Sequence, residues 1–127
     1  MLQIVPIYAA ILTLFYVALS MRTIRQRAKH KITIGDLGNQ ELARAIRAHS
    51  NFIEYTPLAL ILFSMIELNG GSPKLVHGLC IAFLLARVTH ALTISQINEP
   101  FKYRKLGMIL TFTSLITAAL YLFFSVI

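Results

Sequence analysis

The chain has 127 residues and a net charge of +7, and 57% of its residues are apolar while 13% are charged. A soluble domain of this length needs more charged residues to cover its surface, so the composition excludes a soluble globular protein. The basic clusters lie beside apolar stretches, as they normally do in membrane proteins, and form no nucleic-acid-binding motif. We therefore expect no nucleic-acid partner.

Four apolar stretches, residues 1–21, 48–66, 75–98 and 106–127, have the length of about 20 residues that a bilayer crossing requires. They predict helices over about residues 3–26, 40–68, 73–98 and 101–126, in a single domain that spans residues 1–127. The first stretch has no basic residue before its apolar run, so we interpret it as a retained helix and not as a signal peptide. Short connections favour an all-α, up-down bundle of four transmembrane helices.

The basic residues predict the orientation of this bundle. The first and third connections contain most of them, namely Arg22, Arg25, Arg27, Lys29, Lys31, Lys102, Arg104 and Lys105. The second connection has only Lys74. By the positive-inside rule, the first and third connections are cytoplasmic and both termini lie outside.

The second predicted helix carries a polar stripe. Arg44, Arg47, Asn51 and Glu54 follow one another at spacings of three, four and three residues, which places them on one helical face. A charged side chain that faces lipid costs at least ~2.5 kcal/mol, so this face should contact protein or a polar cavity. Pro57 follows one turn later, where it removes a backbone hydrogen bond and predicts a bend.

The third predicted helix carries Arg87 and His90 three residues apart on one face. Arg87 lies near the middle of its apolar run, and Glu54 is the carboxylate at comparable depth. We therefore predict an Arg87–Glu54 contact, within one subunit or across a subunit boundary. Such a pair can serve only to specify helix register. The larger set of aligned polar residues favours a functional site, because intramembrane ionisable groups commonly mark one.

The other histidines and the single cysteine have structural interpretations. His30 lies in a predicted loop, His49 and His77 lie near helix ends, and Cys80 is a small packing residue within a span. They form no ligand cluster, so we predict no metal site. The first and fourth helices, apart from their basic ends, are interpreted as packing and lipid-facing segments.

Residues 47–57 read Arg-Ala-His-Ser-Asn-Phe-Ile-Glu-Tyr-Thr-Pro. This segment strongly resembles the signature Arg-Ala-x-x-Asn-x-x-Glu-x-x-Pro of the MAPEG family, the membrane-associated proteins of eicosanoid and glutathione metabolism. Every fixed position is matched, and the Ala86–Arg87 pair and the four-span layout match as well. The resemblance implies a homotrimer that binds glutathione between neighbouring subunits, near the cytoplasmic face. Size and loop lengths are most similar to short bacterial members, which implies the bacterial inner membrane.

The resemblance also implies roles for individual residues. The positions that match glutathione-binding positions are Arg27, Arg47, Asn51, Glu54, Tyr55, Arg87 and His90. Arg104 matches the arginine that stabilises the glutathione thiolate, and is the predicted catalytic residue. One turn after His90, where several relatives have a tyrosine, this chain has Ile94. The implied activity is transfer of the thiolate to a hydrophobic electrophile from the bilayer, with peroxidase activity as an open alternative.

Other functional classes compete with this enzyme. A non-catalytic binding or scaffold protein of the same fold is favoured by Ile94, which removes one ligand contact. A small proton-coupled transporter typically needs a carboxylate in its first helix, and residues 3–26 contain none. A haem protein needs facing axial histidines, for which only His49 and His90 are candidates, and His49 lies among arginines. The glutathione-dependent enzyme is therefore the preferred hypothesis.

Overall fold

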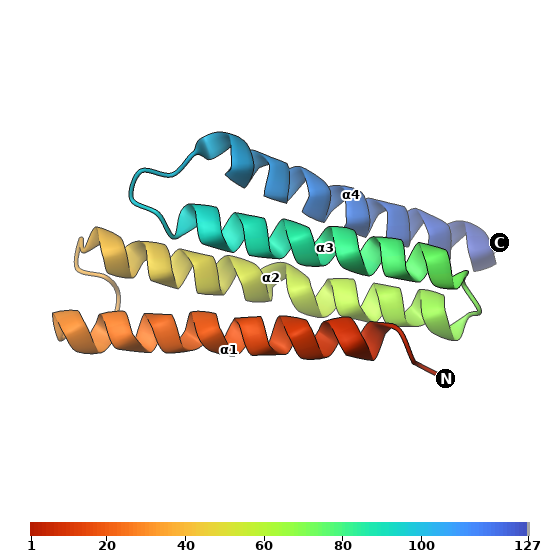
Figure 1. Cartoon of the computed structure of the whole chain (residues 1–127), viewed down its shortest axis with the longest axis horizontal. Coiled ribbons are helices and arrows are strands. Elements are labelled where there is room, and N and C mark those ends of the chain that lie inside the picture. The colour runs from red at the N-terminus through yellow and green to blue at the C-terminus, as the bar shows by residue number, and fades with distance from the viewer. Residues whose placement is uncertain (127) are drawn as a thin grey trace.

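The computed structural model describes residues 1–126, which form four α-helices: α1 (Val5–His30), α2 (Gln40–Leu68), α3 (Pro73–Ile94) and α4 (Phe101–Val126). The helices run up and down beside one another in chain order (Figure 1). Each is long and apolar enough to cross a membrane. This arrangement confirms the predicted all-α membrane bundle.

The middle of the bundle is formed by α2 and α3, and each of them packs against both outer helices. Within residues 1–126, α1 and α4 do not contact each other. The start of α1, the α2–α3 connection and the end of α4 lie at one end of the bundle, and the two longer connections lie at the other (Figure 1). We call the latter the connection end. Residues near it on α2, α3 and α4 can therefore meet in one site.

Two helix boundaries differ from the sequence prediction. The first helix continues to His30, four residues beyond the predicted end at 26, and α3 stops at Ile94, four residues before the predicted end at 98. At the end of α3, Arg44 Nη1 donates to the Ile94 carbonyl at 3.2 Å and Arg22 Nη2 donates to the Ser95 carbonyl at 3.1 Å. These arginines satisfy carbonyls that a longer helix would bond internally.

The opposite end of the bundle is held together by neutral and acidic groups. The Glu67 carboxylate, at the end of α2, accepts hydrogen bonds from the backbone amides of Ile4 at 2.7 Å and Val5 at 2.9 Å. It thereby caps the start of α1, where free amides and the helix dipole favour a negative charge. Nearby, the Tyr8 hydroxyl lies 2.8 Å from Nδ1 of His77, which joins α1 to α3.

Small residues bring α4 close to α3. A Cβ atom on Gly107 would lie 2.9 Å from the Ala86 carbonyl oxygen and 3.0 Å from the Cβ of His90. The absence of a side chain at residue 107 therefore allows the two backbones to approach, as small residues do in membrane helix pairs. In α2, the helix continues through Pro57.

The outer surface of the bundle is apolar. Large hydrophobic side chains are exposed along all four helices, among them Ile7, Ile11, Leu14, Leu58, Ile61, Leu85, Leu92, Ile109, Ile116, Leu120 and Phe123. In water such a surface would be unfavourable, whereas in a bilayer it meets hydrocarbon. The bundle therefore has the apolar outer surface that contact with membrane lipid requires.

Candidate functional site

Arg87 is fully buried between α2, α3 and α4. Its guanidinium donates to Asn51 Oδ1 at 2.5 Å and to Thr111 Oγ1 at 3.1 Å. Nη2 also lies 3.5 Å from Nδ1 of His90, and the guanidinium carbon lies 5.4 Å from the centre of the Tyr55 ring. None of these four partners is a carboxylate. Nδ1 of His90 can accept a hydrogen bond from the guanidinium. We call these five residues the Arg87 cluster.

The predicted contact between Arg87 and Glu54 is not formed within the chain. No ion pair among residues 1–126 joins them. Asn51 lies between Arg87 and Glu54: its Oδ1 accepts a hydrogen bond from Arg87, and its Nδ2 donates one to Glu54 Oε2 at 3.5 Å. Residues three apart on a helix differ in direction by about 60°. When Asn51 faces the interior, Glu54 is therefore turned to the outer surface, where its side chain is exposed.

A cavity of about 360 Å³ lies at the connection end. Its lining residues are Gln40, Ala43, Arg44, Arg47, Ile94, Glu99 and Arg104. They come from α2, from the end of α3, from the α3–α4 connection and from the start of α4, as the antiparallel fold requires. We call this space the arginine cavity.

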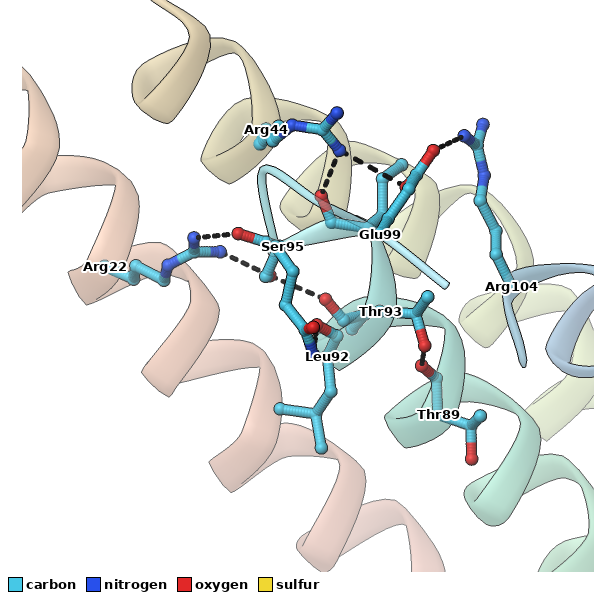
Figure 2. A network of polar contacts seen from close by, with 11 residues as sticks. Arg22, Arg44, Thr89, Leu92, Thr93, Ser95, Glu99 and Arg104 are labelled. Atoms are coloured by element: carbon cyan, nitrogen blue, oxygen red, sulfur yellow. Dashed lines mark hydrogen bonds and ion pairs between the residues drawn. The ribbon is translucent and has the colours of Figure 1, made fainter. Parts of the chain in front are cut away.

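Two arginines of this cavity bind one carboxylate. Arg104 Nη1 lies 2.9 Å from Glu99 Oε1, and Arg44 Nη1 lies 3.3 Å from Glu99 Oε2. Figure 2 shows Glu99 between the two arginines, which approach it from α2 and from α4. The Glu99 side chain is 18% exposed and those of Arg44 and Arg104 are 25% and 34% exposed, so all three are partly desolvated. Partial burial strengthens their interaction relative to a pair in water.

Backbone groups of the α3–α4 connection are held separately. Arg22 of α1 donates to the Ser95 hydroxyl and, at 3.1 Å, to its carbonyl, as Figure 2 shows. The C-terminal end of a helix has a partial negative charge, which favours the binding of Arg22 here and of Arg44 at the Ile94 carbonyl. Since Thr111 of α4 also holds Arg87 at 3.1 Å, the two outer helices contribute more than the packing predicted for them.

Arg27 lies apart from the other predicted site residues. Its Nη1 donates to the carbonyls of Thr33 at 3.2 Å and Gly35 at 3.0 Å, which ties the α1–α2 connection to α1. Arg27 is not among the residues that line the arginine cavity. Within one chain its contacts are those of a loop-binding residue.

The fold therefore divides the predicted site residues into two groups. Arg47 and Arg104 line the arginine cavity, with Ile94 as an apolar part of its wall. Asn51, Tyr55, Arg87 and His90 belong to the deeper Arg87 cluster, and Glu54 joins it from the outer surface.

Three participants were absent from the predicted site. Arg44 was visible in the polar stripe, but its spacing did not show that it reaches the α3–α4 connection. Glu99 lies in that connection just before Pro100, outside any helical pattern. Thr111 is one of several hydroxyl residues in α4, and only the packing at Gly107 shows that it faces Arg87. Glu99 and Thr111 carry no signal in residue spacing, and the spacing of Arg44 placed it on the stripe without showing which group it binds.

The charges of the arginine cavity favour an anionic ligand. Three guanidinium groups and one carboxylate line it, which leaves an excess of two positive charges. Guanidinium groups bind carboxylates through paired hydrogen bonds, and they stay charged in partly buried sites. Within residues 1–126 the Arg47 side chain makes no ion pair. It is therefore available to such a ligand.

The fold and this cavity define a four-span membrane protein with an arginine-rich site at its connection end. The sequence model of the MAPEG family matches residues 5–124, and the chain belongs to that family, which confirms the resemblance of residues 47–57. A relative from Escherichia coli (strain K12), named "Inner membrane protein YecN", is 32% identical over 114 residues, covering 90% of this chain and 86% of the relative. A protein of the same name from an Escherichia coli O6:H1 strain matches with the same identity and coverage.

Proposed function

We propose that this protein is a glutathione-dependent membrane enzyme that transfers the glutathione thiolate to a hydrophobic electrophile. The observation that carries the proposal is the gathering of Arg44, Arg47 and Arg104 around one cavity, directly beside the family motif of α2. Peroxidase activity uses the same thiolate, with a lipid hydroperoxide as the oxidant, and is a second outcome of the same chemistry.

Glutathione has the functional groups that this region can bind. It carries two carboxylates, one ammonium group and one thiol. Arg47 lines the cavity and has no ion-pair partner within residues 1–126, so it can bind a carboxylate. Glu54 lies about 10 Å further along α2, at ~1.5 Å per residue, and can bind the ammonium group. The ligand would therefore lie along α2.

Arg104 is the proposed catalytic residue. A free thiol has a pKa of about 8.5, and the thiolate is the nucleophile. Lowering this pKa by about two units requires about 2.7 kcal/mol of preferential stabilisation of the thiolate. A guanidinium in a partly desolvated site can provide energy of that order. The thiol proton leaves to water, the sulfur bonds to the electrophilic carbon, and the leaving group departs with the electron pair of the broken bond.

The outward-facing charges of α2 support a homotrimer with glutathione between neighbouring subunits. Arg47 and Glu54 are both exposed on a single chain. A charge that faces lipid is costly, whereas a ligand and an adjoining subunit would cover both. We propose that the trimer lies in the bacterial inner membrane with the connection end in the cytoplasm, because this end carries most of the basic residues and the Escherichia coli relative is named an inner membrane protein.

A non-catalytic glutathione-binding protein of the same fold is the second candidate. Ile94, whose side chain lines the cavity, favours it because an apolar group there cannot hydrogen-bond to the ligand. Binding without turnover of any hydrophobic electrophile would support this candidate over the enzyme.

Calorimetric titration of the detergent-solubilised protein with glutathione tests the proposal. Wild type should bind, and Arg47→Ala should lose about tenfold in affinity, or about 1.4 kcal/mol. Arg25→Ala is the matched control, because it removes the same charge from an exposed residue of α1 that does not line the cavity. The absence of glutathione binding by wild type would contradict the proposal.

A further inference from the structure

We infer that the Glu99 carboxylate is a built-in competitor for the ligand of the arginine cavity, which an incoming anion has to displace from Arg44 and Arg104. That the physiological anion is glutathione rests on the proposed function. The displacement itself follows from how the cavity is occupied, and applies to any anion of suitable size.

Glu99 uses both of its carboxylate oxygens to bind arginines of the cavity. Oε1 lies 2.9 Å from Arg104 Nη1 and Oε2 lies 3.3 Å from Arg44 Nη1. A carboxylate of a ligand, or a thiolate, would seek the same donors, because these guanidinium groups converge there. The Glu99 carboxylate therefore occupies the position that the cavity offers to an anion (Figure 2).

The Glu99 side chain can leave Arg44 and Arg104 without releasing the α3–α4 connection. The backbone of this connection is held by Arg22 at the Ser95 carbonyl, 3.1 Å away, and by Arg44 at the Ile94 carbonyl, 3.2 Å away. Neither bond involves the Glu99 side chain. Since side-chain rotations do not require the backbone to move, the carboxylate can turn away from the cavity while the connection stays in place.

The displacement of Glu99 has a consequence for ligand specificity. A neutral molecule cannot replace a carboxylate on two guanidinium groups, because it would leave Arg44 and Arg104 partly buried and unpaired. An anion can do so, at the cost of breaking the bonds to Glu99. The cost of moving Glu99 is the same for every ligand that must displace it, and only an anion recovers that cost from Arg44 and Arg104. Glu99 also keeps Arg104 paired until the thiol group of a ligand arrives.

The experiment compares Glu99→Gln with wild type by calorimetric titration in the same detergent, using glutathione and inorganic sulfate as probes. The variant keeps the shape of the side chain and removes its charge. We expect both anions to bind about tenfold more tightly, which corresponds to about 1.4 kcal/mol. Should Glu99→Gln fail to fold, Glu99→Asp keeps the charge but shortens the reach to both arginines, and should tighten binding by a smaller factor.

The matched control is Glu41→Gln. Glu41 also binds two basic side chains, Lys29 at 2.7 Å and His30 at 3.2 Å, and it also lies at the connection end, but it does not line the arginine cavity. The control changes the net charge of the protein by the same amount. Equal tightening in both variants would be a general charge effect and would overturn the inference.

The remaining outcomes separate this inference from the proposed function. Unchanged or weaker anion binding by Glu99→Gln, with glutathione bound by wild type, overturns the role of Glu99 and leaves the proposed function standing. Tighter sulfate binding by Glu99→Gln, with glutathione bound by neither protein, supports the role of Glu99 and contradicts the proposed function. If no variant binds either anion, both are wrong.

Discussion

The Arg87 cluster and the arginine cavity are both built around guanidinium groups, but these groups differ in burial and in the partners that they bind. Arg87 is fully buried, and its guanidinium bonds to Asn51 of α2, Thr111 of α4 and His90 of its own helix, α3. In the cavity, Arg44 and Arg104 are partly exposed and share one carboxylate. The first arrangement is closed by packing, and the second opens to the end of the bundle.

This difference suggests different roles: Arg87 positions neighbouring residues, and the arginines of the cavity bind a ligand. Arg87 was predicted to bind the ligand directly. Because its guanidinium is fully buried within one chain and bonds to Asn51, we expect it instead to position Asn51. The cavity arginines can exchange one anion for another at little structural cost. Substitutions in the Arg87 cluster should therefore change stability first, and substitutions in the cavity should change ligand affinity or reactivity first.

Replacing Arg87 with alanine should cause the largest loss of stability. The change empties the space of a large, fully buried side chain and removes its hydrogen bonds to Asn51 and Thr111. Truncating a large buried side chain typically costs about 3 kcal/mol, which unfolding of the detergent-solubilised protein would measure. Near-wild-type stability would show that the cluster does not hold the helices together.

Replacing Arg104 with alanine should have its main effect on the thiolate. If Arg104 lowers the pKa of the bound thiol from about 8.5 to about 6.5, its loss should reduce the thiolate fraction, and with it the conjugation rate at pH 7, by about 25-fold. The ultraviolet absorbance of bound thiolate should disappear, while stability should fall by less than about 1 kcal/mol because the lost ion pair is partly exposed.

Lys105→Ala is the control for this prediction, because Lys105 is the adjacent basic residue and does not line the cavity. It should keep both the thiolate signal and the rate. An unchanged absorbance in Arg104→Ala would remove Arg104 from the catalytic role.

The number, order and class of the helices could be predicted from the sequence because apolar runs of membrane length leave few alternatives. The end of α3 could not be predicted. Residues 95–98 contain no charge and no helix breaker before Glu99 and Pro100, so they were predicted to continue the helix, but the carbonyls of Ile94 and Ser95 are taken by arginines from α2 and α1. Helix ends that depend on side chains far away in the chain leave no local signal.

The site could be predicted in the same partial way. Helical spacing placed Asn51 and Glu54 on one face of α2, and Arg87 was predicted to contact Glu54, whereas in the structure Arg87 Nη2 lies 2.5 Å from Asn51 Oδ1. Residue spacing could not show how far α2 is rotated about its axis. This rotation determines that Arg87 contacts Asn51 and not Glu54. Glu99 follows no periodic pattern and became visible only once the connection had been placed between Arg44 and Arg104.

The close approach of α3 and α4 supports both regions, since α4 carries Thr111 and Arg104. Gly107→Ala would place a Cβ 2.9 Å from the Ala86 carbonyl oxygen, which forces the helices apart. We expect a loss of about 1–2 kcal/mol in unfolding experiments, as for other overpacked interiors. The control is Gly78→Ala in α3, where a Cβ would meet no atom within 4 Å and should raise stability slightly. Equal behaviour of the two variants would contradict this account of the α3–α4 contact.

The smallest predicted effect concerns one hydrogen bond of the Arg87 cluster. Thr111→Val keeps the shape of the side chain but removes the hydroxyl that accepts from Arg87 at 3.1 Å. Interhelical hydrogen bonds in membranes contribute about 0.6 kcal/mol on average, so we expect a loss of stability of that size and unchanged glutathione affinity. Thr113→Val is the matched control, because Thr113 is exposed on α4. A fall in affinity with Thr111→Val alone would show that the Arg87 cluster takes part in ligand binding, and that closure by packing does not confine it to a positioning role.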